Sequence, residues 1–340
     1  MISRSDKVLL AETQNCFPLV ARPYAQIGAR LGLSETEVIS RLKRLKKRKL
    51  IRYVGAIFDL KRIGCRASLI AMQVPATQVK RVAGLINRYP QITHNYLREG
   101  EFNLWFTLNS RSRSQSEALL ASIRRTTGGL PMLDLATRVV YKIDARFRLA
   151  AGACDRAVRP QTRGQPAIRR KRIALNTLPA LNQPLSFTRR PFARMAARLG
   201  TTEAGAVGLL RTYLDDGFIR RFGAVLAHQR VGFTANALAV WQVSPRHLKQ
   251  VVAGMVDNRH ISHCYLRRRY PVWPYNLYTM IHARSRRECN AIIALILRGN
   301  RNKIKSHTVL FTVKELKKAR LDPTWLLRNQ RETNAGSTSG

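Results

Sequence analysis

The chain has 340 residues with an apolar share of 45%, enough for two or more packed domains, and no apolar run approaches the roughly 20 residues of a membrane helix. Its formal charge of +42, from 61 lysines and arginines against 19 aspartates and glutamates, predicts attraction to polyanions: nucleic acid, an anionic membrane or a carboxylate-rich ligand. The polar amino terminus has no signal core, and five cysteines without a C-x-x-C pair favour a reduced compartment, so a soluble cytoplasmic protein is expected.

The first 60 residues read as a helix-turn-helix module. Apolar residues between Leu9 and Leu31 indicate two short helices, and Gly32 allows a tight turn. Ser34-Glu35-Thr36-Glu37 is a capping box, in which the serine accepts from the third helical amide and the glutamate reaches back. The helix that follows would take the position that enters a DNA groove. It carries seven bases: Arg41, Lys43, Arg44, Lys46, Lys47, Arg48 and Lys49.

Residues 61–150 alternate between strand and helix patterns. Strands are predicted near residues 67–74, 92–98, 102–108 and 133–141, and helices near 78–89 and 114–126. The order strand, helix, strand, strand, helix, strand is that of a ferredoxin-like α+β unit.

A basic segment with proline and glycine, residues 151–172, is predicted to be a linker to a second copy of this arrangement. A helix-turn-helix-like module is expected over residues 173–230 and a second ferredoxin-like domain over 231–322. The latter has strands near 235–243, 261–267, 275–282 and 307–313 and helices near 245–258 and 285–297. Residues 323–340 are predicted to be a disordered tail.

The second helical module weakens the case for DNA binding. Its helix near residues 204–214 contributes Arg211 as its only base, and Asp215-Asp216 follow, which would repel phosphate. A structural or dimerising role for these modules is therefore favoured, with the basic first helix being largely a solvated face. The alternative is a transcriptional regulator that reads DNA through Arg41, Arg44 and Lys47.

One motif occurs twice. His94-Asn95-Tyr96-Leu97-Arg98, followed by Asn103-Leu104-Trp105-Phe106-Thr107, returns as His263-Cys264-Tyr265-Leu266-Arg267, followed by Asn276-Leu277-Tyr278-Thr279-Met280. The chain is thus an internal duplication. On a strand, His, Tyr and Arg at i, i+2 and i+4 project from one surface, which indicates a site able to donate protons and bind anions.

The two copies differ in the connection that follows the motif. The second copy inserts Arg268-Arg269-Tyr270-Pro271-Val272-Trp273-Pro274-Tyr275, whereas the first has only Glu99-Gly100-Glu101-Phe102. The Trp-Pro-Tyr run could instead be an aromatic-filled core turn, and a single strand histidine is usually a hydrogen-bonded, half-buried residue. His260 and His263 would face opposite sides of a strand, so a protein metal site is not expected.

A helix-turn-helix followed by a ferredoxin-like domain resembles the Lrp/AsnC regulators. The two hairpin motifs, and Trp273-Pro274-Tyr275-Asn276-Leu277 above all, resemble something narrower: the siroheme decarboxylases, with their D and L subunits of haem d1 biosynthesis fused end to end. The resemblance covers residues 5–322. It implies removal of two acetate carboxyl groups from siroheme as CO₂ to give didecarboxysiroheme, in haem d1 or alternative haem biosynthesis.

The resemblance also implies roles for individual residues. It implies catalysis by His263, Arg267, His282 and Tyr265, with His263 and His282 as candidate acids and His282 alternatively an iron ligand. Substrate binding would fall to His94, Tyr96, Arg98, Trp105, Arg268, Arg269, Trp273 and Tyr275. Gly100 stands where many members have a second histidine, which leaves catalysis and a structural or binding role about equally open for the first copy. The carboxyl-terminal hairpin is favoured for the chemistry.

The ring of the substrate can serve as the electron sink, so no cofactor beyond the iron of siroheme is expected. As partners, the resemblance implies the anionic tetrapyrrole itself and either a homo-oligomer or a complex with a second Lrp-like decarboxylase pair.

Overall fold

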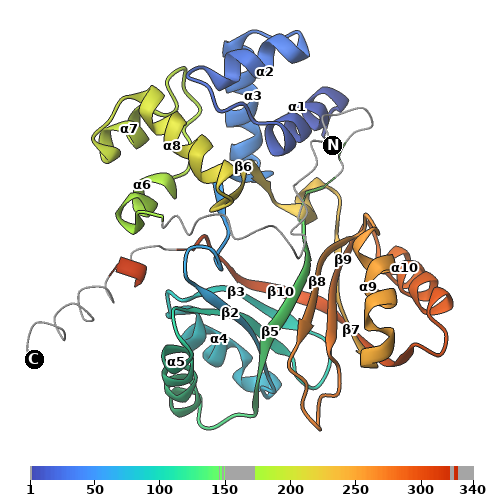
Figure 1. Cartoon of the computed structure of the whole chain (residues 1–340). Helices are drawn as coiled ribbons and strands as arrows, with labels where there is room; N and C mark the ends of the chain where they lie inside the picture. Colours follow the sequence, from blue (N-terminus) through green and yellow to red (C-terminus); the bar gives the residue numbers. More distant parts are fainter. Residues whose placement is uncertain (1, 145, 148, 150–172, 322–324, 328–340) are drawn as a thin grey trace, which may run out of the picture. The chain divides into compact units, whose positions relative to one another are not determined.

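The computed structural model describes residues 2–144, 146–147, 149, 173–321 and 325–327, and these form two compact units (Figure 1). One unit comprises described residues of 1–63, 146–232 and 323–340, and the other consists of residues 64–145 and 233–322. The breaks lie close to the predicted boundaries at residues 60, 150, 230 and 322. Each unit therefore combines equivalent parts of both halves of the chain. The predicted linker, 151–172, lies outside the described residues.

The helical unit contains both amino-terminal modules. The first half contributes α1 (Arg4–Asn15), α2 (Pro23–Leu31), α3 (Glu35–Lys47) and β1 (Ile51–Phe58), and the second contributes α6 (Leu178–Leu181), α7 (Ala193–Leu199), α8 (Glu203–Asp215) and β6 (Ile219–Leu226). Strands β1 and β6 pair antiparallel, with Gly55 opposite Gly223. This two-stranded sheet was not predicted, because each strand finds its partner only in the other half of the chain.

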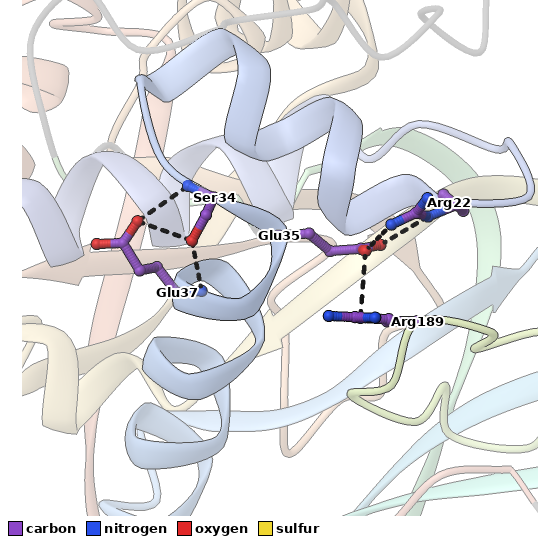
Figure 2. A network of polar contacts seen from close by, with 5 residues as sticks. All are labelled: Arg22, Ser34, Glu35, Glu37 and Arg189. Atoms are coloured by element: carbon purple, nitrogen blue, oxygen red, sulfur yellow. Dashed lines mark hydrogen bonds and ion pairs between the residues drawn. The ribbon is translucent and has the colours of Figure 1, made fainter.

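The predicted capping box begins α3. Ser34 Oγ accepts from the main-chain nitrogen of Glu37 at 3.2 Å, and the Glu37 carboxylate accepts from that of Ser34 at 2.9 Å (Figure 2). The neighbouring Glu35 forms ion pairs with Arg22 and with Arg189 of the second half. Acidic groups in the first turn also complement the helix dipole.

The second half repeats part of this arrangement. Arg190 contacts Glu203 at 2.6 Å as Arg22 contacts Glu35, and Thr202 accepts from Gly205 N at the start of α8. Gly205 stands where Glu37 stands in α3, so no reciprocal carboxylate bond is possible there.

The α+β unit has the predicted order of elements in each half. The first half forms β2 (Arg66–Met72), α4 (Val79–Asn87), β3 (Ile92–Arg98), β4 (Leu104–Ser110), α5 (Arg113–Thr126) and β5 (Met132–Ile143). The second forms β7 (Ala235–Val243), α9 (Leu248–Val256), β8 (Ile261–Arg267), β9 (Leu277–Ala283), α10 (Arg286–Gly299) and β10 (Ile304–Lys318).

The strands of both halves close into one barrel in the order β10-β3-β4-β2-β5-β8-β9-β7. The last strand of each half makes this possible, because it is long enough to pair twice. Strand β5 pairs with β2 of its own half and β8 of the other, and β10 pairs with β7 and with β3. Both strands appear in Figure 1 as long arrows crossing the unit.

Apolar side chains of this unit pack on both faces of the barrel strands. Helices α4 and α5 pack on the outer face of the first-half strands, and α9 and α10 pack on those of the second half. A further cluster lies on the opposite face of the strands, inside the barrel, and takes residues from both halves. Among its members are Trp105, Leu135, Leu238, Trp273, Tyr278 and Leu310.

Reciprocal lysine contacts reinforce the two seams, which are the strand pairs β5–β8 and β10–β3 that join the halves of the chain. Lys142 Nζ donates to the main-chain oxygens of Val256 and Asn258 at 2.7 and 2.9 Å, at the end of α9. Lys317 Nζ donates likewise to Asn87 and Tyr89 at 2.7 and 3.0 Å, at the end of α4. Each lysine thus satisfies orphan carbonyls of a helix in the other half.

Three residues of the predicted disordered tail, 325–327, are described, and they form a helical turn with Trp325 and Leu326 buried. The expectation of disorder is wrong for them, because both apolar side chains find a core; the rest of the tail lies outside the described residues. No helix in the described ranges is long and apolar enough to cross a bilayer.

Candidate functional site

The repeated motif forms a stacked ladder on each of two strands. On β8 the rings of His263 and Tyr265 stack with centroids 5.9 Å apart and an interplanar angle of 26°. The Arg267 guanidinium lies 4.5 Å from the Tyr265 centroid. The three side chains project from one surface, as predicted.

The first half builds the same ladder on β3. The rings of His94 and Tyr96 stack at 6.3 Å and 29°, and the Arg98 guanidinium lies 5.2 Å from the Tyr96 centroid. The geometry of the motif is therefore conserved between the copies, although the connections that follow differ.

Each ladder arginine joins the two halves of the chain. Arg267 Nη1 donates to the main-chain oxygen of Leu135 at 3.1 Å and to Thr137 Oγ1 at 2.8 Å, both on β5. Arg98 Nη1 donates to the main-chain oxygen of Leu310 at 3.1 Å and to Thr312 Oγ1 at 2.9 Å on β10. The two contacts are related by the internal duplication. No motif in the sequence marks the two threonines for this role.

The ladder arginines are buried cations, and no carboxylate of the described residues forms an ion pair with either. Arg98 is 4% exposed and Arg267 9% exposed, and neither takes part in an ion pair with any residue described in the structure. Their Nε atoms are buried and have no hydrogen-bond partner there. Burial lowers the pKa of Arg98 to about 10 and also lowers that of Arg267. A buried guanidinium of this kind favours an anion nearby.

His282 lies on the same face of the hairpin as the second ladder. His263 pairs with Met280 across β8 and β9, and His282 follows two residues later, so it extends the row past His263 at the end away from Arg267. It is 8% exposed. The structure thus brings His282, His263, Tyr265 and Arg267 into one row.

The equivalent of His282 in the first half is Asn109, because β4 and β9 align from Leu104 and Leu277 onward. Asn109 is fully buried and donates to Gln91 O at 2.8 Å. Gly100 lies in the turn after Arg98 with φ of 102°, where an added Cβ would come within 2.9 Å of the Leu310 side chain. A histidine there would be strained, so the turn explains this glycine.

The aromatic residues form a core between the halves. Trp273 is 8% exposed and packs against Phe102 and Trp105 of the first half, at centroid distances of 5.5 and 5.8 Å. Trp273 Nε1 donates to Tyr278 Oη at 2.9 Å, and Tyr275 Oη lies 2.6 Å from Thr308 Oγ1. Trp105 is fully buried. This arrangement fits the reading of the Trp-Pro-Tyr run as an aromatic-filled core turn.

The inserted residues of the second copy contain a tight turn. Tyr270 and Trp273 exchange two main-chain hydrogen bonds of 3.0 Å, and Val272 between them is 72% exposed. Arg268 and Arg269 are exposed before this turn, and the Arg268 guanidinium lies 5.3 Å from the Tyr270 ring. These two arginines are therefore separate from the buried row.

The asparagine of each Asn-Leu element has a structural role. Asn103 accepts from Val74 N at 3.0 Å and donates to Val74 O at 2.8 Å. Asn276 makes the same pair of bonds to Val243, at 2.9 and 2.8 Å. The recurrence of this residue reflects anchoring of the hairpin rather than chemistry.

Comparisons with known proteins identify the parts of the chain. Residues 62–142 and 230–317 match the family described as "AsnC-like ligand binding domain", and residues 6–52 match "Siroheme decarboxylase NirDL-like HTH domain". The chain therefore has an amino-terminal helix-turn-helix and two AsnC-like domains, as predicted.

Relatives match along most of the chain. The siroheme decarboxylase NirDL subunit of Paracoccus denitrificans is 32% identical over 85% of this chain and 88% of its own length. A siroheme decarboxylase of Hydrogenobacter thermophilus is 27% identical over 93% of each. A crystal structure of the siroheme decarboxylase NirDL shares the fold, with a TM-score of 0.67 at 24% identity over 97% of this chain and 99% of that one. The chain thus belongs to the siroheme decarboxylase family of NirDL-like proteins.

Proposed function

We propose that this protein is a siroheme decarboxylase, as its relatives are named, and that it removes the carboxyl groups of two acetate side chains of siroheme. The observation that carries the proposal is the pair of ladders, each ending in a buried arginine that forms no ion pair with a carboxylate of the described residues. A substrate rich in carboxylates would provide the missing anions. One solved NirDL structure is described as a complex with an iron-uroporphyrin III analogue, a ligand of the same chemical class.

The reaction needs a positioned anion and a proton. The bond between the acetate methylene and its carboxyl carbon breaks, CO₂ leaves, and the electron pair stays on the methylene carbon, where a proton completes a methyl group. The macrocycle can delocalise the pair, so the chemistry needs no cofactor beyond the substrate's own iron. A positioned acid contributes roughly 10²- to 10⁴-fold.

The row of side chains on the second hairpin contains groups suited to both tasks, binding the anion and supplying the proton. Arg267 would hold the reacting carboxylate, and His263 or His282 would supply the proton, with Tyr265 as an alternative donor. On the first half, His94, Tyr96 and Arg98 would bind a further part of the macrocycle. Arg268 and Arg269 are exposed and suited to outer carboxylates.

The aromatic residues would take two different parts. Tyr275 is half-buried at the inserted turn and is suited to pack on a flat ligand, whereas Trp273 and Trp105 are buried and would support it from the core.

The test is incubation of the purified full chain with siroheme without oxygen. Mass spectrometry should show a product lighter by two carbon dioxide units, and His263→Ala and Arg267→Ala should suppress it. An exposed arginine on α10, Arg287, provides the control variant Arg287→Ala, which should convert siroheme at the wild-type rate. Failure of the wild type to convert siroheme, alone or with a second Lrp-like decarboxylase pair, would contradict the proposal.

The second helical module is best explained as a degenerate helix-turn-helix. Gly200 takes the left-handed conformation of Gly32 between the two helices, with φ of 63° and 65°. Arg211, the one base of α8, donates both Nε and Nη2 to Leu19 O. We infer that this module serves assembly within the chain or a homo-oligomer.

DNA reading is the less supported alternative. On α3, Arg44 contacts Asp6 at 3.2 Å and Lys46 donates to Arg52 O, so part of the basic face is already occupied. Sequence-selective, salt-sensitive duplex binding that depends on Arg41, Arg44 and Lys47 would support a regulator, and equal affinity for all sequences would reduce it to bulk electrostatics.

A further inference from the structure

The last strand of each half lies beside the ladder of the other half. Residues directly opposite each other on antiparallel strands project from the same face. Strand β5 places Val140 opposite Tyr265 and Ile143 opposite His263. All four side chains are half-buried. Val140 and Ile143 therefore form an apolar wall along the second ladder.

The first ladder has charged neighbours at the same positions. Strand β10 places Glu315 opposite Tyr96 and Lys318 opposite His94, and these side chains are also half-buried. Glu315 and Lys318 form a charged wall that is polar but adds no net charge, because the two charges have opposite signs. The two seams thus present different surfaces to their ladders.

The threonines that accept from the ladder arginines fix the correspondence between β5 and β10. Val140 and Glu315 each follow that threonine by three residues. Ile143 and Lys318 each follow it by six residues. Each half therefore shows which residue the duplicated fold accepts at the equivalent position of the other.

The lysines that reinforce the seams show which way the wall residues face. Lys142, next to Ile143, bonds to carbonyls at the end of α9, and Lys317, next to Lys318, bonds to those at the end of α4. Both helices pack outside the barrel. Adjacent residues of a strand point to opposite faces, so Ile143 and Lys318 lie on the inner face with the ladders.

The strand on the other side of each ladder repeats the contrast. Strand β9 places Met280 opposite His263, whereas β4 places Thr107 opposite His94. The histidine of the second ladder thus has an apolar neighbour on both adjacent strands. The histidine of the first ladder has a polar neighbour on both.

Apolar surroundings favour a ligand group that loses its charge. An acetate arm that is decarboxylated changes from an anion to a methyl group, and CO₂ leaves as a neutral molecule. Apolar side chains provide no hydrogen bonds for the carboxylate, but they gain contact with the methyl group. Their interaction with the arm therefore improves along the reaction, which is the requirement for lowering a barrier. An arm that keeps its carboxylate gains nothing from such surroundings.

We propose that Val140 and Ile143 are specificity-determining residues, which make the second ladder selective for the arm that becomes a methyl group. The charged wall makes the first ladder a site for an arm that stays polar. This deepens the proposed function and rests on it for the identity of the reaction. Arg267 would hold the carboxylate at the end of the ladder, and the apolar wall would contact the carbon that remains.

The duplication supplies the test variants. The double substitution Val140→Glu with Ile143→Lys gives the second ladder the wall of the first and leaves the net charge unchanged. The control exchanges the equivalent residues of the outer face, Val139→Lys with Lys314→Val, again without a change in net charge. Both variants are made in the full chain.

Absorbance titrations with iron coproporphyrin III and iron uroporphyrin III measure the preference of the ligand-free protein. The first porphyrin has methyl groups where the second has acetates, and both keep their propionates. We expect the wall exchange to weaken binding of the methyl-bearing porphyrin relative to the acetate-bearing one by roughly tenfold. The outer-face control should keep the wild-type ratio of dissociation constants. An unchanged ratio in the wall exchange would overturn the proposal.

A milder variant tests the wall if the double substitution does not fold. Val140→Thr keeps the branched shape and adds only a hydroxyl, so it should move the ratio in the same direction by roughly threefold. The wild-type ratio in Val140→Thr would then count against the apolar wall.

Turnover provides a second readout. The wall should act on the transition state more than on the bound substrate, so its exchange should lower kcat for siroheme roughly tenfold with little change in KM. The outer-face control should keep the wild-type kcat. A wild-type kcat in the wall exchange would contradict the proposal.

The titrations separate this proposal from the proposed function, because they require no turnover. A shifted ratio in a protein that fails to convert siroheme would contradict the decarboxylase proposal alone. Conversion of siroheme by the wild type, with an unchanged ratio in the wall exchange, would contradict the specificity proposal alone.

Discussion

The ladder arginines serve structure and ligand binding with different atoms of one side chain. Nη1 of Arg267 is occupied by the main-chain oxygen of Leu135 and by Thr137, and Arg98 repeats this on the other seam. The guanidinium is thereby fixed over its tyrosine ring. A rigid planar cation of this kind is already oriented for an anion, which reduces the entropy lost on binding.

Arg267→Lys should therefore weaken substrate binding although it keeps the charge. A lysine ammonium cannot reproduce the fork that bridges β5 and still face a ligand, so we expect the KM for siroheme to rise by roughly tenfold. Steady-state kinetics would measure this, with Arg287→Lys on the exposed face of α10 as control. An unchanged KM in Arg267→Lys would show that the arginine only joins β8 to β5 and does not bind substrate.

The cysteines in the described α+β unit should be unreactive. Cys65, Cys264 and Cys289 are buried free thiols, and burial raises their pKa to about 12, 12 and 11. The thiolate is the reacting species, so a raised pKa leaves very little of it at pH 8.

We expect iodoacetamide at pH 8 to label these three thiols at least about 100-fold more slowly in the native chain than in urea. Peptide mass spectrometry after timed quenching gives the rate for each cysteine. Rapid labelling of Cys264 in the native protein would mean that β8 opens to solvent.

At the scale of elements, Gly100 and Gly84 differ in whether their backbone conformation requires a glycine. Gly100 has φ of 102° in the turn between β3 and β4, whereas Gly84 lies within α4 with open space around it. Only the first needs the conformational freedom of glycine.

Gly100→Ala should destabilise the protein by about 1–2 kcal/mol, because alanine is strained at this φ and its Cβ approaches Leu310. Gly84→Ala is the matched control and should stabilise by about 0.5–1 kcal/mol, since alanine is the better helix former. Urea unfolding followed by tryptophan fluorescence suits both, because three of the four tryptophans lie in this unit. Equal shifts in the two variants would refute the distinction.

Local patterns allowed the elements of the α+β unit to be predicted, and long-range pairing accounts for the differences. Strand β3 has the predicted bounds, because its alternation is local. Strand β10 was predicted over residues 307–313 but runs from Ile304 to Lys318, since its second half pairs with β3 of the other half. Strands β1 and β6 were missed for the same reason.

The candidate site was predictable only in part. The ladder residues stand out because they recur at strand spacing. Thr137 and Thr312 could not be recognised, because they become relevant only when the last strand of each half crosses to the other. Val140 and Ile143 show the same limitation: their place beside the second ladder depends on the pairing of β5 with β8 rather than on any motif.

For the whole α+β unit, the duplication produces two equivalent seams on opposite sides of one barrel. Strands β5 and β10 lie four positions apart in either direction around the barrel. Lys142 reinforces one seam and Lys317 the other, each by bonding two carbonyls at the end of a helix in the other half.

Lys142→Met and Lys317→Met should each lower the free energy of unfolding by about 1–2 kcal/mol, because each leaves helix carbonyls without a charged donor while keeping most of the side-chain volume. The lysines share no partner, so the double variant should lose the sum of the single losses to within about 0.5 kcal/mol. Lys314→Met, at an exposed position of β10, is the control and should change stability by less than about 0.5 kcal/mol. If the double variant lost much less than the sum, breaking one seam would already release the other, and the barrel would depend on both seams as a single cooperative closure rather than on two independent ones.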